Sequence, residues 1–180
     1  SANEGIVDGF SGATPLANAA AGEPLPSIAD MFFGFVPGSI GETSTLAILI
    51  GAAILIYTGI GSWKVMLSCV LGALGVGCLL NLTAINPYME MPPYLHLIMG
   101  GFAFGAVFMA TDPVTGAQTG TGKWIYGFLI GVFTIVIRVF NLGYPEGMML
   151  AILFMNAFAP LIDHYVVEAN IRRRLKRAKI

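Results

Sequence analysis

The chain has 180 residues, of which 56% are hydrophobic and only 11% are charged, and its mean hydropathy is +0.79. These values exclude an ordinary soluble domain and predict a membrane protein. Nine basic residues against ten acidic ones leave a net charge of −1, and we expect no nucleic-acid partner. No basic region leads into a short apolar core at the start, so we expect no signal peptide and interpret the chain as part of a longer polypeptide.

The chain opens with a polar segment, which we treat as a first domain over residues 1–42, outside the membrane. Its residues 8–17 read DGFSGATPLA, a run of small residues followed by proline that is typical of an exposed turn. The hydroxyls of Ser11 and Thr14 are accessible in such a turn, and Asp8 can accept backbone hydrogen bonds. Turn chemistry alone predicts an exposed loop and nothing more.

The segment from 24 to 42, PLPSIADMFFGFVPGSIGE, is apolar in part but does not predict a membrane-crossing helix. It is too short and too often interrupted by proline and glycine, because a helix needs about 20 apolar residues to cross the hydrocarbon. We therefore predict an interfacial or re-entrant segment.

Five apolar stretches follow, each close to the length of about 20 residues that a crossing helix needs. Glu42, Thr43 and Ser44 are suited to the start of the first helix, as capping groups and as a negative charge near its positive end. Pro160 in the last stretch predicts a kink or a break. We assign residues 43–165 to one all-α transmembrane domain of about five helices. The stretches are residues 43–58, 63–82, 93–110, 124–140 and 145–165.

Small residues in the second stretch indicate tight packing. Gly72, Gly75 and Gly77 would let a neighbouring helix approach closely. Cys69 and Cys78 have a spacing that matches no metal or redox motif, and we interpret them as packed apolar residues.

The basic residues predict the orientation of the chain. Five crossings place the two ends of the domain on opposite sides, and the tail over residues 166–180 carries six of the nine lysines and arginines, which predicts a cytoplasmic tail. Lys64 and Lys123 then also fall on the cytoplasmic side, and only Arg138 lies toward the outside. The first 42 residues contain no Lys or Arg, so the DGFSGATPLA loop is expected outside the cytoplasm. The tail is either a topology anchor or an amphipathic basic helix on anionic lipid.

Two acidic residues stand near the cytoplasmic ends of apolar stretches. An acid at the bilayer centre costs about 2.5–3.5 kcal/mol, so each acid should lie near an end, be paired or be useful. Asp112 closes the third stretch and Asp163 stands late in the fifth. Because oxygen ligands suit hard cations, both are candidates for the uptake of Na⁺ from the cytoplasm. Alternatively, Asp163 solvates a helix end and Asp112 begins an Asp-Pro turn.

Arg138 is the one basic residue toward the outer side, and it precedes a loop that contains Glu146. Two interpretations stay open: a salt bridge within the protein, or a guanidinium fork that binds the phosphate or the ring of a flavin. His96, inside the third stretch, is interpreted as a packed histidine.

The pattern Asp8-x-x-Ser11-Gly12-Ala13-Thr14 resembles the flavinylation motif in which a threonine hydroxyl is joined to the phosphate of FMN by a phosphoester bond. Two further stretches, GFVPGSIGETSTLAILIG and MATDPVTGAQTGTGKWIYG, strengthen the resemblance. Over nearly its whole length, the chain resembles the C-terminal half of the B subunit of the bacterial Na⁺-translocating NADH:quinone oxidoreductases.

The resemblance implies a covalent FMN on Thr14 and a fold like one half of a pair of inverted five-helix repeats, as in urea channels. It also implies a flavin transferase that works outside the cytoplasm, which agrees with the orientation predicted from the lysines and arginines. The other residues of the motif that this transferase would read are Asp8, Ser11, Gly12 and Ala13.

As in the family it resembles, the chain would be an oxidoreductase and translocase subunit in a bacterial inner membrane. Electrons would pass through FMN toward a non-covalent riboflavin and then ubiquinone, while the complex moves Na⁺ outward, and the partners would be the other subunits of the complex. NADH is not expected to bind this chain, since no glycine-rich nucleotide fingerprint is present. Two alternatives remain: the D subunit of an Rnf-type ferredoxin:NAD⁺ oxidoreductase, and a channel or transporter that keeps the helical repeat without a redox role.

Overall fold

A computed structural model describes residues 14–21, 24–39, 41, 43–83, 87–141 and 146–178. Within these residues every regular element is a helix. Asp8, Ser11, Gly12 and Ala13 of the flavinylation motif lie outside the described residues, and Thr14 is the first residue described.

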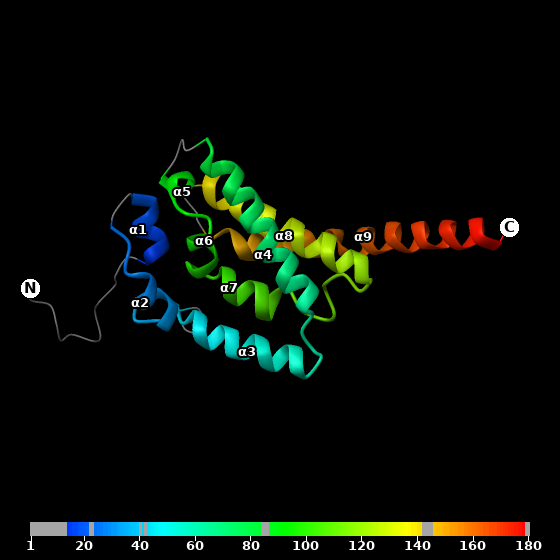
Figure 1. Ribbon diagram of the computed structural model, residues 1–180, viewed down its shortest axis with the longest axis horizontal. Coiled ribbons are helices and arrows are strands. Elements are labelled where there is room, and N and C mark those ends of the chain that lie inside the picture. The colour runs from blue at the N-terminus through cyan, green and yellow to red at the C-terminus, as the bar shows by residue number, and fades with distance from the viewer. Residues whose placement is uncertain are drawn as a thin grey trace, which may run out of the picture.

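The helices include three that are long and apolar enough to cross a membrane, namely α4, α8 and α9, and a shorter apolar helix, α3. An all-α membrane protein is therefore confirmed. In chain order the elements are α1 (Pro15–Ala21), α2 (Ile28–Phe33), α3 (Thr45–Tyr57), α4 (Trp63–Asn81), α5 (Pro87–Glu90), α6 (Leu95–Ile98), α7 (Phe102–Phe104), the π-helical turn η1 (Gly105–Met109), α8 (Gly120–Phe140) and α9 (Gly147–Ala178) (Figure 1).

Helix α8 packs against both α4 and α9 and forms the centre of the bundle. Glycines let α4 and α8 approach closely: a Cβ on Gly72 would overlap the carbonyl oxygen of Phe128, and a Cβ on Gly131 would overlap that of Cys69. The close approach predicted for Gly72 is confirmed, whereas Gly75 has nothing within 4 Å. Cys69 is buried in this contact, while Cys78 is exposed.

The third apolar stretch is not the continuous helix that its composition predicts. Helix α6 ends at Ile98, and Gly100 has a φ of 65°, a left-handed conformation that glycine adopts at little cost. A new helical segment, α7 followed by η1, begins at Phe102. A break of this kind leaves carbonyl groups at the end of one helix and N–H groups at the start of the next without helical partners. Such groups are tolerated at membrane depth only where the protein supplies other partners.

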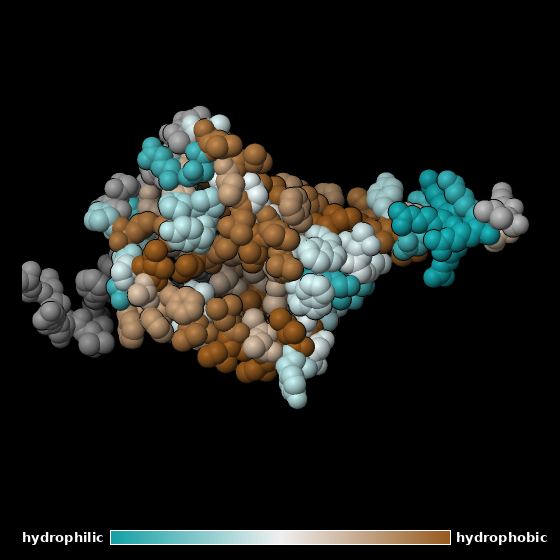
Figure 2. Space-filling model, in the orientation of Figure 1, coloured by the Kyte–Doolittle hydropathy of each residue, from teal (hydrophilic) through white to brown (hydrophobic). Residues whose placement is uncertain are grey.

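The two ends of the described chain lie at opposite ends of the bundle (Figure 1). Helices α1 and α2 cover one end, and α9 projects from the other as a single helix. This helix runs through Pro160 without a break, so of the predicted kink or break the break is wrong. In the space-filling view, apolar residues cover much of the bundle, and the projecting end of α9 is hydrophilic (Figure 2).

Candidate functional site

Thr14 stands directly before α1, and it is exposed. It lines a pocket of about 350 Å³ between the N-terminal helices and the break after α6. Apolar side chains supply most of the lining, including those of Leu16, Met31 and Met99, and Glu146 adds a carboxylate. The pocket therefore combines an accessible hydroxyl, an apolar wall and one acidic group.

The break between α6 and α7 is stabilised by a buried arginine and by Glu146. Arg138 is fully buried, and its guanidinium donates hydrogen bonds to the carbonyl oxygens of His96 at 2.8 Å and of Met99 at 3.3 Å. The Glu146 carboxylate accepts the N–H of Gly101 at 3.1 and 3.2 Å. Carbonyls at the end of α6 thus have a cationic donor, and the N–H before α7 has an anionic acceptor, as the two ends of a broken helix require.

Arg138 precedes the loop that contains Glu146 in the sequence, and in the structure both side chains lie next to Gly100. A Cβ placed on Gly100 would stand 2.6 Å from Glu146 Oε2 and 3.4 Å from Arg138 Nη2. Of the two, Glu146 lines the Thr14 pocket, whereas Arg138 does not line it and donates to the carbonyls of His96 and of Met99, a lining residue. These two hydrogen bonds use two of the five N–H groups of the guanidinium. Sequence reasoning missed Glu146 as a pocket residue, and the pair Gly100-Gly101 was the signal for a break.

Asp163 connects α9 to the start of α8. Its carboxylate accepts hydrogen bonds from the N–H of Gln118 at 2.7 Å, the N–H of Thr119 at 3.0 Å and the Thr119 hydroxyl at 2.6 Å. The Thr119 hydroxyl in turn caps α8 by accepting the N–H of Gly122 at 3.0 Å. The acid therefore does more than solvate a helix end, because it orders the loop that leads into α8.

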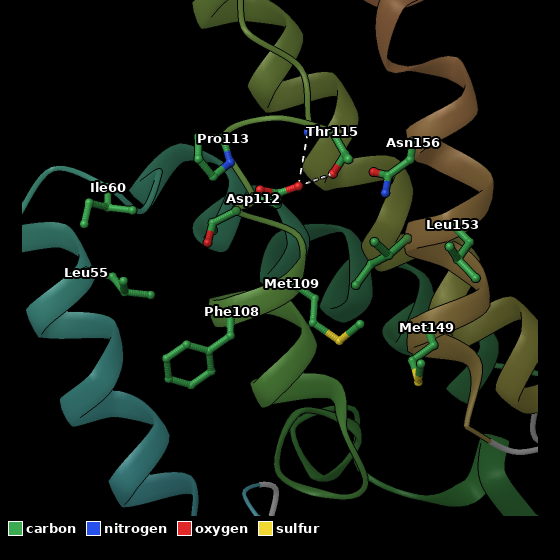
Figure 3. A pocket seen from close by; sticks show the side chains of 12 residues that line it. Leu55, Ile60, Phe108, Met109, Asp112, Pro113, Thr115, Met149, Leu153 and Asn156 are labelled. Atoms are coloured by element: carbon green, nitrogen blue, oxygen red, sulfur yellow. Dashed lines mark hydrogen bonds between the residues drawn. The ribbon is translucent and has the colours of Figure 1, made fainter.

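Asp112 organises the same loop from its other side. It accepts the Thr115 hydroxyl at 2.7 Å and the N–H groups of Val114 and Thr115 at 3.3 and 3.2 Å, the pattern of an Asp-initiated turn. The Thr115 hydroxyl, followed by the Val114 N–H, lowers the pKa of Asp112 below its ordinary value of 3.8. Asp112 and Thr115 line a pocket of about 440 Å³ together with Asn156 of α9 (Figure 3). Among the described residues, no group of three or more acidic, histidine or cysteine side chains is close enough to hold a metal ion.

Comparison with known proteins identifies relatives along nearly the whole chain. Residues 2–172 match the family described as NQR2, RnfD, RnfE. The chain is 56% identical over 179 residues to the B subunit of the Na(+)-translocating NADH-quinone reductase from Ectopseudomonas mendocina (strain ymp), covering 95% of the chain and 44% of that protein. It is 56% identical over 180 residues to the same subunit from Chromohalobacter salexigens, with 95% and 43% covered, and 52% identical over 186 residues to that from Yersinia pestis, with 96% and 45% covered.

The chain thus spans less than half the length of the curated relatives it matches. The family match nonetheless runs from the polar N-terminal segment through α4 and α8 and into α9, and it ends at residue 172, before most of the basic tail. The chain belongs to the NQR2, RnfD, RnfE family.

Proposed function

We propose that the chain is the membrane part of a Na⁺-translocating NADH:quinone oxidoreductase subunit and that Thr14 carries FMN through a phosphoester bond. The observation that carries the proposal is the position of Thr14. This residue is exposed, and it borders the pocket next to the break between α6 and α7. The threonine at this position also ends a motif that resembles a flavinylation sequence.

The pocket fits the ring system of a flavin in size and chemistry. Its volume of about 350 Å³ falls in the usual range for small-molecule sites, about 300–1,000 Å³, which are mostly apolar with a few polar groups. Leu16, Met31 and Met99 offer apolar surface to a planar aromatic ring. The Glu146 carboxylate would repel a phosphate, which favours a phosphate at the pocket mouth on Thr14 and a ring inside.

A flavin held in this way would supply one- and two-electron transfer, so the chain itself would need no redox-active side chain. The residues of the chain then have three tasks. Thr14 Oγ1 anchors the phosphate, the apolar lining limits access of water to the ring, and Arg138 with Glu146 keeps the pocket floor in one conformation through the hydrogen bonds at the break.

The proposed orientation puts Thr14 in the periplasm and the basic tail in the cytoplasm of a bacterial inner membrane. Support comes from their positions at opposite ends of the bundle (Figure 1) and from the distribution of lysines and arginines along the chain. Asp112 and Asp163 both bind the loop before α8 and would lie on the cytoplasmic side. We propose that they take part in Na⁺ uptake, with the cation competing for oxygens that now accept hydrogen bonds.

The proposal implies several partners outside this chain. These are the other subunits of the complex, a flavin transferase that modifies Thr14, a non-covalent riboflavin and ubiquinone as the electron acceptors, and Na⁺ as the transported ion. The names of the relatives support the quinone and the ion, and each of those relatives has additional sequence that this chain does not cover.

Flavin fluorescence of the denatured subunit in a gel tests the attachment, after expression of the full complex in cells that contain the transferase. We expect a fluorescent band for the wild type and a dark band for Thr14→Ala. Thr43→Ala is a matched control, because Thr43 lines the same pocket, and its band should stay fluorescent. A dark wild-type band, or a fluorescent Thr14→Ala band, would contradict the proposal.

The family description also includes RnfD, so a subunit of an Rnf-type ferredoxin:NAD⁺ oxidoreductase is the second candidate. The relatives at 52–56% identity carry the quinone reductase name, which favours the first. Quinone-dependent oxidation of NADH by the purified complex separates the two. A channel without a redox role would have a dark band in the gel experiment.

A further inference from the structure

A third pocket lies where α4 and α8 begin, which is the end of the bundle opposite α1 (Figure 1). It has a volume of about 330 Å³ and is lined by Lys64 of α4, Lys123 of α8 and the turn that follows α3. Lys64 Nζ lies 3.5 Å from the point where a Cβ on Gly120 would stand. The lysine of α4 therefore reaches the first residue of α8, and both ammonium groups border one cavity.

Lys64 and Lys123 are the charged residues that line this pocket, and Asp112 lines a small adjoining pocket together with Lys123. Among the described residues the ion pair within 4.0 Å joins Arg172 to Glu168, so neither lysine has a carboxylate partner at that distance. Asp163 is an acid that interacts electrostatically with Lys123, and its oxygens already accept three hydrogen bonds from the loop before α8. Ser62, the N-cap residue of α4, lines the pocket and makes no side-chain hydrogen bond to the helix, while its carbonyl oxygen accepts the N–H of Val65 at 3.0 Å.

Two tryptophans lie at this end of the bundle. Trp63 is the first residue of α4 and Trp124 lies in the second turn of α8, and their rings meet edge to face with centroids 5.9 Å apart. Tryptophan is enriched where a membrane helix enters the headgroup region, and lysines at the same level extend their charges into it.

A separate, open apolar groove lies farther along α4 and α8. It has a volume of about 340 Å³, and its lining includes Leu71 of α4 and Trp124 and Phe128 of α8. On α4, Lys64 and Leu71 are seven residues apart and thus on one face of the helix, about 10 Å along its axis. A cationic pocket and an apolar groove therefore follow each other along the same pair of helices.

We propose that this surface binds an anionic phospholipid, with the phosphodiester at Lys64 and Lys123 and an acyl chain in the groove along Leu71 and Phe128. A lipid fits better than an acidic peptide from another subunit, because the groove beyond the lysines offers almost no polar surface for a peptide backbone. The site is separate from the Thr14 pocket and does not depend on the proposed redox role.

Native mass spectrometry of the intact complex, purified in detergent with the full-length subunit, tests the site. The complex is titrated with dioleoylphosphatidylglycerol or with dioleoylphosphatidylcholine. We expect tighter binding of phosphatidylglycerol to the wild type. The double variant Lys64→Gln/Lys123→Gln should weaken this binding about 30-fold, which follows from about 1 kcal/mol for each lysine, without changing the binding of phosphatidylcholine.

Two matched variants keep the test specific. Lys64→Arg/Lys123→Arg retains both charges and should bind phosphatidylglycerol like the wild type. Arg173→Gln/Arg174→Gln removes two charges from the exposed tail and should also bind like the wild type. A folding defect in the glutamine variant would instead weaken both lipids equally.

Several results would overturn the proposal. One is equal affinity for the two lipids, and another is an unchanged affinity in the glutamine variant. Displacement of the lipid by excess inorganic phosphate would mean that the site accepts a free anion. Failure of the wild-type complex to bind phosphatidylglycerol would mean that another subunit covers the pocket.

Discussion

Arg138 and Glu146 meet at Gly100, where a single methyl group would stand 2.6 Å from one side chain and 3.4 Å from the other. The arginine binds the carbonyls that precede the glycine and the glutamate binds the N–H that follows it. Two charged side chains thereby replace the backbone hydrogen bonds that the break in the helix removes. This arrangement forms the floor of the Thr14 pocket.

Replacing Arg138 should destabilise the subunit strongly. Arg138→Met leaves the carbonyl oxygens of His96 and Met99 without this donor and the Glu146 carboxylate without its neighbouring cation. We expect a loss of about 3 kcal/mol or more, because each unsatisfied buried group costs roughly 1–3 kcal/mol. Thermal unfolding of the purified complex measures the effect. The unfolding midpoint of Arg138→Lys should fall between those of the wild type and Arg138→Met, since lysine keeps the charge but lacks the planar fork. An unchanged unfolding midpoint in Arg138→Met would contradict this account.

Glu146→Gln should change the flavin more than the fold. The glutamine keeps an oxygen to accept the N–H of Gly101 but removes a negative charge from the pocket lining. A carboxylate near a flavin opposes the addition of an electron, so the reduction potential of the Thr14-linked flavin should rise by on the order of tens of millivolts. Redox titration of the complex measures it. The control Thr43→Ala changes an uncharged residue of the same pocket and should leave the reduction potential unchanged. A reduction potential unaffected by Glu146→Gln would contradict the expected effect of the carboxylate on the flavin.

Gly100→Ala and Gly59→Ala separate backbone strain from crowding. Both glycines have a positive φ, 65° and 73°, so each alanine incurs roughly 1–2 kcal/mol of strain. A Cβ on Gly59 meets nothing within 4 Å, whereas one on Gly100 meets Glu146 Oε2 and, at 3.0 Å, Leu16 Cδ2. Gly100→Ala should therefore lower the unfolding temperature more than Gly59→Ala. Equal shifts would mean that the break accommodates a methyl group.

Gly131→Ala should separate α4 from α8, while Gly75→Ala should not. A Cβ on Gly131 would overlap the Cys69 carbonyl, but one on Gly75 has open space. In a helix interior, alanine is favoured over glycine by up to about 1 kcal/mol, so Gly75→Ala should be neutral or stabilising. Comparing the thermal stability of the two variants in detergent tests the contact between α4 and α8. A destabilised Gly75→Ala protein would show that the surface of α4 that makes contacts is larger than described.

Asp163→Asn should loosen the loop before α8. The asparagine carries one oxygen in place of two and no charge, so it cannot accept all the bonds from Gln118 and Thr119. Hydrogen bonds to a charged group contribute about 1.5–3 kcal/mol, and amide exchange in residues 116–122 should accelerate roughly tenfold to a hundredfold.

Glu168→Gln is the control for Asp163→Asn, since Glu168 forms an exposed pair with Arg172 on the projecting part of α9. Its loss should leave exchange in the loop unchanged, because exposed pairs contribute little. Protection of the loop that survives Asp163→Asn would mean that other contacts hold it.

Much of the architecture is determined by the sequence alone, because a chain in lipid must satisfy its backbone hydrogen bonds internally and long apolar stretches can do so only as helices. The expected stretch over residues 63–82 agrees with α4 (Trp63–Asn81) within a residue or two. The helix α9 extends to Ala178 rather than ending near 165, since residues after the apolar part, such as Glu168 and Arg172, are good helix formers in water as well.

What only the tertiary structure decided is how distant residues complete one another. The third stretch has the composition of a continuous helix, yet it breaks at Gly100, because Arg138 and Glu146, far along the chain, supply the missing donors and acceptor. The interpretation of Asp163 likewise depended on Thr119, which stands 44 residues earlier. Local composition predicts a segment's preference for a helix, but it contains no information about which buried groups will meet a broken end, and that meeting shapes the pocket beside Thr14.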